Sequence, residues 1–113
     1  MMCWLIDDEV VTGFGRTGKM FAIEHWGVKP DIMAKGITSA YIPFGAIAFS
    51  GEIWNTLKGS SFITYTCAGH PVGAAAAVKT IEVYKRDKVV ENAARVGKYA
   101  MERLKNVLGH YRG

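Results

Sequence analysis

The stretch CWLIDDEVVTGFGRTG, residues 3–18, decides the fold because an apolar run passes directly into three acids and a glycine-rich loop. The apolar part predicts a short buried strand whose carboxyl end emerges into a polar site. As a bare pattern, Gly13–Gly18 is G-x-G-x-x-G after a strand, which is typical of a dinucleotide-binding turn. Asp31 follows 18 residues after Gly13, near the place where such folds carry their ribose-binding acid. One interpretation is therefore a nucleotide-binding oxidoreductase.

The three acids in front of this loop argue against a bound pyrophosphate. A dinucleotide turn holds phosphate on backbone N–H groups at the start of a helix, yet Asp7, Asp8 and Glu9 stand immediately before the turn. Each like-charge pair at about 4 Å costs about 1 kcal/mol in water and several times more in a partly dry cleft. The acids suit a cation better: a metal, a basic side chain or a protonated ring nitrogen. A metal needs further ligands, and His25 is the only imidazole in the first half of the chain, so we predict no metal site.

Strand and helix signals alternate along the chain. Gly27 ends a first short helix, a turn at Pro30–Asp31 precedes the second strand, and Ser50 and His70 are favourable N-caps. The alternation predicts an α/β layer structure. The expected elements are a strand over 3–10, about two helical turns over 19–26, a brief strand within 28–36 after the turn, and a strand over 43–50. A helix over 51–58 and long helices that begin at Pro71 and Asp87 follow.

The two C-terminal helices carry most of the positive charge. Residues 1–78 have five Lys/Arg and six Asp/Glu, whereas residues 79–113 have nine and four, so these two segments carry net charges of −1 and +5. The basic residues alternate with apolar ones at helical spacing and have no aromatic platform beside them, so we expect a solvated helix face and no nucleic-acid partner. The run Gly73–Ala77 is small enough for a close neighbour, and Glu82 and Arg86 have the spacing of an ion pair. An apolar stripe is expected to be core: Val89, Ala93, Val96, Ala100, Leu104 and Val107.

Length and composition set the remaining limits. The chain has 113 residues, half of them hydrophobic, and no apolar run reaches the roughly 18–20 residues of a bilayer span. Cys3 and Cys67 have no metal spacing, and two scattered cysteines are most simply reduced thiols, which favours the cytoplasm. Two or three strands are too few for a parallel sheet buried on both faces. We therefore expect a piece of a larger protein.

Three segments taken together resemble the class III aminotransferases: LIDDEVVTGFGRTGKMFAIEHWGVKPDIM, AKGITSAYIPFGAIAFS and TCAGHPVGAAAA. The resemblance runs in order along nearly the whole chain, with the ω-amino-acid transaminases as the nearest relatives. It implies a fold-type I enzyme dependent on pyridoxal 5′-phosphate, with residues 1–113 as the central part of the large cofactor-binding domain, a mostly parallel sheet flanked by helices. It also implies a homodimer that moves an amino group from an amine or ω-amino acid to a keto acid.

The resemblance assigns four residues to the cofactor. Asp8 matches the aspartate that pairs with the pyridine nitrogen, and a carboxylate there keeps the ring charged and electron-accepting. Val10 lies on the same side of the strand and matches the apolar residue packed against the ring. Lys35 matches the catalytic lysine, which forms the Schiff base and carries the proton. Thr66 matches a threonine whose hydroxyl reaches the phosphate from the neighbouring subunit, whereas Arg16 receives no catalytic role.

Two departures from the family pattern matter. Family members have two further residues between the segments that here meet at Met33 and Ala34, and two residues of strand span roughly 6.6 Å. A lysine that bonds to the cofactor is sensitive to such a shift, so a non-catalytic remnant that packs on a partner is a second rival, which predicts no chromophore. Val11 stands where the 4-aminobutyrate branch carries a glutamine, which favours the ω-transaminase branch.

Overall fold

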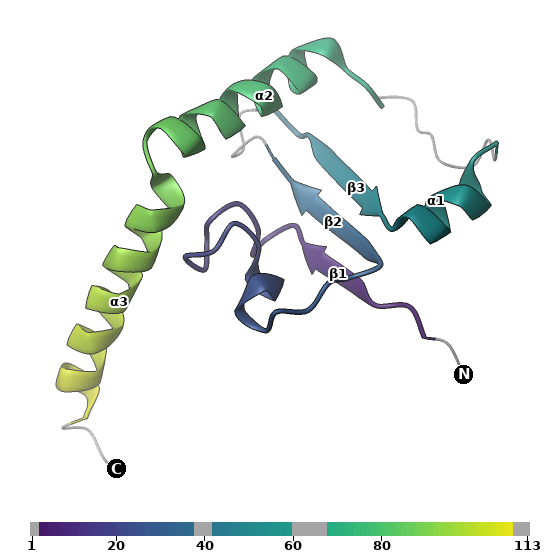
Figure 1. Ribbon diagram of the computed structural model, residues 1–113. Coiled ribbons are helices and arrows are strands. Elements are labelled where there is room, and N and C mark those ends of the chain that lie inside the picture. The colour runs from purple at the N-terminus through teal and green to yellow at the C-terminus, as the bar shows by residue number, and fades with distance from the viewer. Residues whose placement is uncertain (1–2, 38–41, 60–67, 110–113) are drawn as a thin grey trace.

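The computed structural model describes residues 3–37, 42–59 and 68–109 (Figure 1). Strands and helices alternate in it as an α/β chain. The elements are β1 (Ile6–Glu9), the 3-10 helix η1 (Ala22–His25), β2 (Ile32–Gly36), β3 (Gly45–Phe49), α1 (Gly51–Leu57), α2 (Pro71–Arg86) and α3 (Val89–Leu108).

The three strands form one mixed sheet in the order β1-β2-β3. β1 and β2 are parallel, and β2 and β3 are antiparallel. Asp8 is in register with Ala34, and Glu9 is in register with Lys35. Because paired residues point to the same side and successive residues alternate, the sheet has an Asp8 face and a Glu9 face. Lys35 belongs to the Glu9 face.

Asp31 fixes the start of β2 against the chain that enters β1. Its carboxylate accepts a hydrogen bond from the Leu5 backbone N–H at 2.8 Å, and its own N–H donates to the Leu5 carbonyl at 3.0 Å. These bonds lie at the amino end of β1, the end away from the glycine-rich loop. Asp31 is therefore a strand-pairing residue, and its expected place beside a ribose is wrong.

The helix boundaries follow the predicted caps in two places. The Ser50 hydroxyl accepts from the Ile53 N–H at 3.4 Å, and His70 Nδ1 accepts from the Gly73 N–H at 3.4 Å. The two turns expected before Gly27 are a single 3-10 turn, and Gly27 ends it with a positive φ of 64°.

Two details of the long helices differ from expectation. Glu82 pairs with Lys79 at 2.9 Å rather than with Arg86, whose guanidinium binds Asp87. Asp87 ends α2 instead of starting the next helix, because Lys88 adopts a left-handed conformation with φ 50° and breaks the helical path. The break turns α3 away from α2, as Figure 1 shows.

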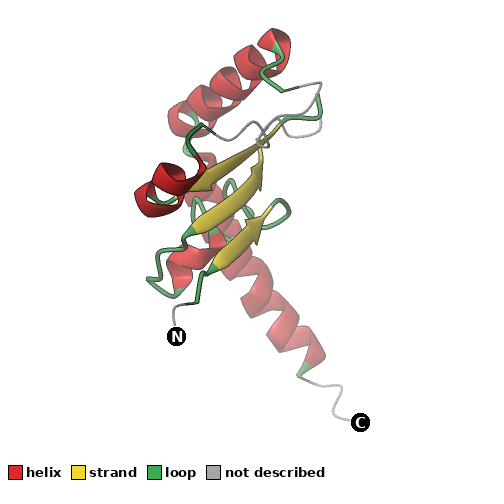
Figure 2. Cartoon of the chain, turned by 90° about the vertical axis from the view of Figure 1, so that its right-hand side faces the viewer, coloured by secondary structure: helices red, strands yellow, loops and turns green. Residues whose placement is uncertain are grey.

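The core is small and lies where the glycine-rich loop and α2 meet the end of the sheet. Its buried residues in the described ranges are Glu9, Gly13, Gly15, Gly73 and Ala77. The radius of gyration is 17.9 Å, against about 13 Å for a compact domain of this length. Figure 2 shows α3 extending away from the sheet.

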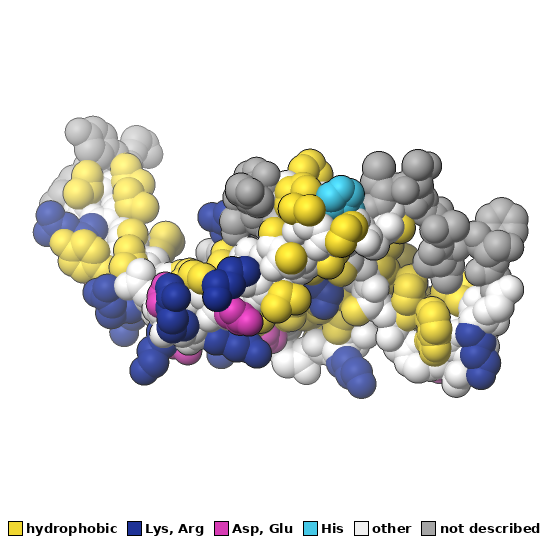
Figure 3. Space-filling model, turned by 90° about the horizontal axis from the view of Figure 1, so that it is seen from above, with side chains coloured by type: hydrophobic (Ala, Val, Ile, Leu, Met, Phe, Trp, Pro, Cys, Tyr) yellow, Lys and Arg dark blue, Asp and Glu magenta, His cyan; other side chains and the backbone are white. Residues whose placement is uncertain are grey.

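The apolar stripe of α3 is the clearest correction to the sequence prediction. It is expected to be core, yet Val96, Leu104 and Val107 are between 45% and 58% exposed. Figure 3 shows hydrophobic side chains at the surface of the molecule seen from above. The stripe has helical spacing, but in the part of the chain that the structure describes only its amino end, near Val89 and Ala93, is half-covered.

Candidate active site

The Asp8 face carries a carboxylate beside an open apolar groove. Asp8 is exposed, and its Oδ1 accepts from the Val10 N–H at 3.0 Å, which holds the carboxylate next to the end of β1. Val10 is 56% exposed and Ile47 is 59% exposed. The Val10 groove, about 370 Å³, is formed by these two side chains together with Ala34 and Phe49, with Lys35, Gly45 and Ala46 completing its lining. Asp8 itself is not part of the lining, but it is in register with Ala34, which is. An open apolar groove next to an anion fits an aromatic ring that carries a protonated nitrogen.

Glu9 is the structural acid of the three. Its side chain is fully buried, and its two oxygens accept from the Ile23 N–H at 2.8 Å and from the Thr12 hydroxyl at 2.5 Å. These bonds tie η1 and the start of the glycine-rich loop to β1. The sequence analysis gave Glu9 no role of its own. The signal was the alternation of a strand, which turns Glu9 away from Asp8.

Asp7 shares the Glu9 face and is half-buried. Its Oδ2 is enclosed and has no hydrogen-bond partner within the described ranges. Burial, followed by the charge of Glu9, raises the pKa of the Asp7 carboxyl above its ordinary value. Asp7 and Asp8 lie on opposite faces of the sheet because they are neighbours in a strand, and Asp7 is partly withdrawn from solvent.

Lys35 lies inside β2, on the face opposite Asp8. It is in register with Glu9, which is the last pair of the β1–β2 ladder, and its Nζ lies 4.7 Å from the centroid of the Phe21 ring. Two more residues before Lys35, as in the family pattern, would carry the lysine beyond this last pair. The structure therefore brings Asp8 and Val10 together, while the Lys35 side chain starts on the face opposite Asp8.

The glycines of the GFGRTG loop serve packing against α3. Gly15 and Gly18 have φ of 88° and 83°. A Cβ on Gly18 would lie 2.8 Å from Ala94 Cα, and one on Gly15 would lie 3.1 Å from a Val90 methyl carbon. The loop leads to the single turn of η1 rather than to an α-helix whose first N–H groups could hold a pyrophosphate. The dinucleotide interpretation has no support in this geometry.

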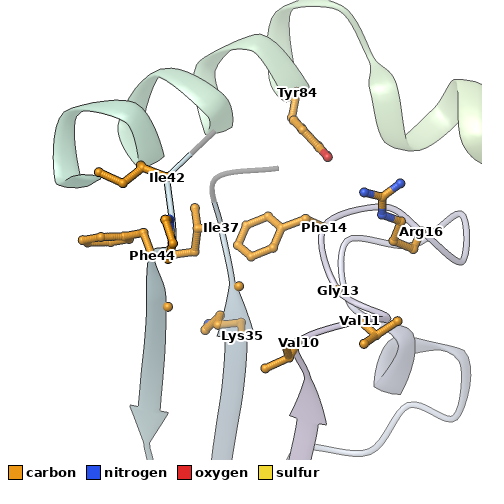
Figure 4. Close-up of a pocket in the computed structure, with 13 residues that line it drawn as sticks. Val10, Val11, Gly13, Phe14, Arg16, Lys35, Ile37, Ile42, Phe44 and Tyr84 are labelled. Carbon is orange, nitrogen blue, oxygen red and sulfur yellow. The ribbon is translucent and has the colours of Figure 1, made fainter. Parts of the chain in front are cut away.

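A second hollow, the Phe14 cavity, lies between this loop, α2 and the ends of β2 and β3. It has a volume of about 450 Å³, and Val10, Phe14, Arg16, Lys35 and Tyr84 are among its lining residues. Figure 4 shows Phe14 and Arg16 reaching from the loop and Tyr84 reaching from α2. Among the described residues that line this cavity, the charged ones are Arg16 and Lys35, and both are cationic. Val10 and Lys35 line both this cavity and the Val10 groove.

Neither a metal site nor a membrane-spanning helix is found in the described ranges, and the expected phosphate contact falls outside them. No three His, Cys, Asp or Glu side chains there are grouped as metal ligands. Within the same ranges, none of the helices has the length and apolar character needed to cross a membrane. Thr66, the expected phosphate contact, lies outside the described residues.

Comparison with known proteins decides between the remaining interpretations. The family model for class-III aminotransferases matches residues 2–112. The chain belongs to this family. The family resemblance drawn from the three sequence segments is thereby confirmed, and the class-III family gives no support to the oxidoreductase alternative.

Individual class-III relatives agree with this assignment. An omega-aminotransferase of Caulobacter vibrioides is 44% identical over 84% of this chain, and a putrescine–pyruvate aminotransferase of Pseudomonas aeruginosa is 39% identical over 93%. The crystal structure of a transaminase from the marine bacterium Virgibacillus superposes on 95% of the chain with a TM-score of 0.89 and 43% identity. This chain spans about a quarter of the length of each of these proteins: 24% of each of the two relatives and 26% of the crystallised chain.

Proposed function

We propose that the protein carrying this chain is a pyridoxal-phosphate-dependent aminotransferase that moves an amino group from an amine or ω-amino acid to a keto acid. The observation that carries the proposal is the exposed carboxylate of Asp8 beside the Val10 groove, in a chain of the class-III family. The relative named for putrescine and pyruvate supports a donor and an acceptor of these classes.

Asp8 and Val10 would hold the ring of the cofactor. The Asp8 carboxylate is free on its exposed face to accept from a protonated pyridine nitrogen, and the Val10 side chain offers an apolar surface beside it. When bound, pyridoxal phosphate supplies a positively charged ring that accepts electrons from the substrate. A carboxylate partner favours the protonated nitrogen because it stabilises the charge.

Lys35 would supply the primary amine that bonds to the cofactor and later carries a proton. Its side chain starts on the Glu9 face, so it must reach the ring past the carboxyl end of β1. Val10 marks that passage, because it lines both the Val10 groove and the Phe14 cavity, as Lys35 does. The proposal therefore needs the amine to leave the position in which the structure holds it.

The wider setting belongs to the same proposal. We take residues 1–113 as the central part of the large cofactor-binding domain of a homodimer, with Thr66 contacting the phosphate of the neighbouring subunit's site. Cys3 is an exposed free thiol, and an exposed thiol persists most readily in a reducing compartment, which supports a cytoplasmic location.

A matched pair of variants of the full-length protein tests the proposal. Asp8→Asn removes the carboxylate of the Asp8 face, and Asp7→Asn makes the same change one residue away on the opposite face. A hydrogen bond to a charged group contributes about 1.5–3 kcal/mol, so Asp8→Asn should weaken pyridoxal phosphate binding roughly 10- to 150-fold. Asp7→Asn should leave the affinity within about twofold, because Asp7 does not face the groove.

Cofactor fluorescence titration measures these affinities, and the absorbance change on adding an amine donor reports the first half-reaction. Equal affinities for the two variants would remove Asp8 from the site. A full-length protein that binds no cofactor and develops no chromophore would instead favour the non-catalytic alternative, in which these helices pack on a partner.

A further inference from the structure

The Lys35 ammonium rests on an aromatic ring rather than on a carboxylate. Its Nζ lies 4.7 Å from the Phe21 ring centroid, within the range in which a cation is attracted to the face of an aromatic ring. The nearest acid in register is Glu9, on the neighbouring strand. Lys35 forms no ion pair with Glu9 among the interactions of the described residues.

Glu9 is fully buried, and each of its oxygens already accepts a hydrogen bond from another group. Oε1 accepts from the Ile23 N–H and Oε2 from the Thr12 hydroxyl. These bonds bring η1, and Phe21 with it, against the Glu9 face. The same acid that could have paired with Lys35 therefore places the ring beneath the amine.

Two interactions fix the position of Phe21, one through its backbone and one through its ring. The Phe21 backbone N–H donates to the Glu24 carboxylate at 2.9 Å, which fixes the residue at the start of η1. Its ring also makes an edge contact with Phe14, with centroids 5.4 Å apart. A fixed ring loses little entropy when it binds a cation, so it can define where the amine rests.

We propose that Phe21 is a positioning residue that holds the Lys35 amine over its ring, on the Glu9 face of the sheet and opposite the Asp8 face. The inference rests on the proposed function for its consequence: the amine reaches the cofactor only after it leaves Phe21. The contact itself depends on no cofactor, so it can be tested independently. A cation–π contact at a partly exposed site contributes a factor of about two to five in the population of the held position.

The test uses reductive methylation of the full-length protein after removal of any bound pyridoxal phosphate, so that the Lys35 amine is free. The reaction with ¹³C-formaldehyde and a reductant keeps the lysine charge and gives each dimethyl-lysine an NMR signal. Lys35→Arg identifies the Lys35 signal. The proposal predicts a signal displaced upfield by the ring current of Phe21. The displacement should disappear in Phe21→Leu and persist in Phe21→Tyr, which keeps the ring.

Phe44→Leu is the matched control, because Phe44 lines the Phe14 cavity with Lys35 and lies close to Gly73, whereas the cation–ring contact of Lys35 is with Phe21. The Lys35 signal should stay displaced in this variant. Phe21→Leu should also raise the rate of Lys35 modification about two- to fivefold, in line with the released contact. An undisplaced Lys35 signal in the wild type, or equal displacement in Phe21→Leu, would overturn the proposal.

The outcome separates this inference from the proposed function. Borohydride trapping of added pyridoxal phosphate on a lysine other than Lys35, with the ring-current displacement intact, would end the catalytic assignment and leave the Phe21 contact standing. Trapping on Lys35 without the ring-current displacement would support the catalytic assignment and overturn the Phe21 contact.

Discussion

Gly18→Ala should destabilise the protein more than an alanine at another glycine of similar backbone conformation. Gly18 has φ 83°, and a Cβ there would lie 2.8 Å from Ala94 Cα and 3.0 Å from Ala94 Cβ. The left-handed conformation costs alanine about 1–2 kcal/mol, and the overpacking adds about 1–3 kcal/mol. The loop and α3 must separate to relieve the contact, so we expect a total loss of about 2–5 kcal/mol in the free energy of unfolding.

Gly27→Ala separates the two contributions. Gly27 also has a positive φ, 64°, but a Cβ there would meet no atom within 4 Å. It should lose only the conformational part, about 1–2 kcal/mol. Urea unfolding of both variants measures the difference, provided that the slopes are equal. Equal losses would refute the close packing of the glycine-rich loop on α3.

Three further predictions concern residues of the Glu9 face and α3. Glu9→Gln should lower the free energy of unfolding by about 1.5–3 kcal/mol in denaturant titrations. Both carboxylate oxygens of Glu9 accept hydrogen bonds, from Thr12 and Ile23, whereas the NH₂ group of glutamine can only donate. The raised pKa of Asp7 contributes stability that is present at low pH and lost as pH rises through the folded-state pKa. Asp7→Asn should therefore match the wild type in acid and exceed it above that pKa, and the same stability at every pH would contradict this. Gly97→Ala should raise the melting temperature by the equivalent of about 0.5–1 kcal/mol, since Gly97 lies within α3 with open space around it.

Local sequence signals predicted the parts of the fold that depend on local chemistry. Ser50 and His70 cap their helices as expected because capping needs only a side-chain acceptor and a free N–H three residues on. The predicted Glu82–Arg86 ion pair does not form, because Glu82 pairs with Lys79 and Arg86 pairs with Asp87. Sequence spacing alone does not show which of several possible ion pairs is favoured.

The features that local sequence leaves undetermined depend on distant contacts. The α3 stripe has core-like periodicity, but periodicity says nothing of which surface covers it. The face of Lys35 depends on the β1–β2 register, which the chain between the strands sets. Glu9 shows the same limit, because three consecutive acids look alike in sequence and only the strand's alternation separates the buried one.

The most direct test of the central claim is the identity of the residue that carries pyridoxal phosphate after borohydride reduction of the full-length protein. Peptide mapping should find the modification on Lys35. Lys35→Arg should abolish it, whereas Lys29→Arg, in the loop before β2, should leave it unchanged. A modified peptide that does not contain Lys35, or unchanged labelling in Lys35→Arg, would contradict the account.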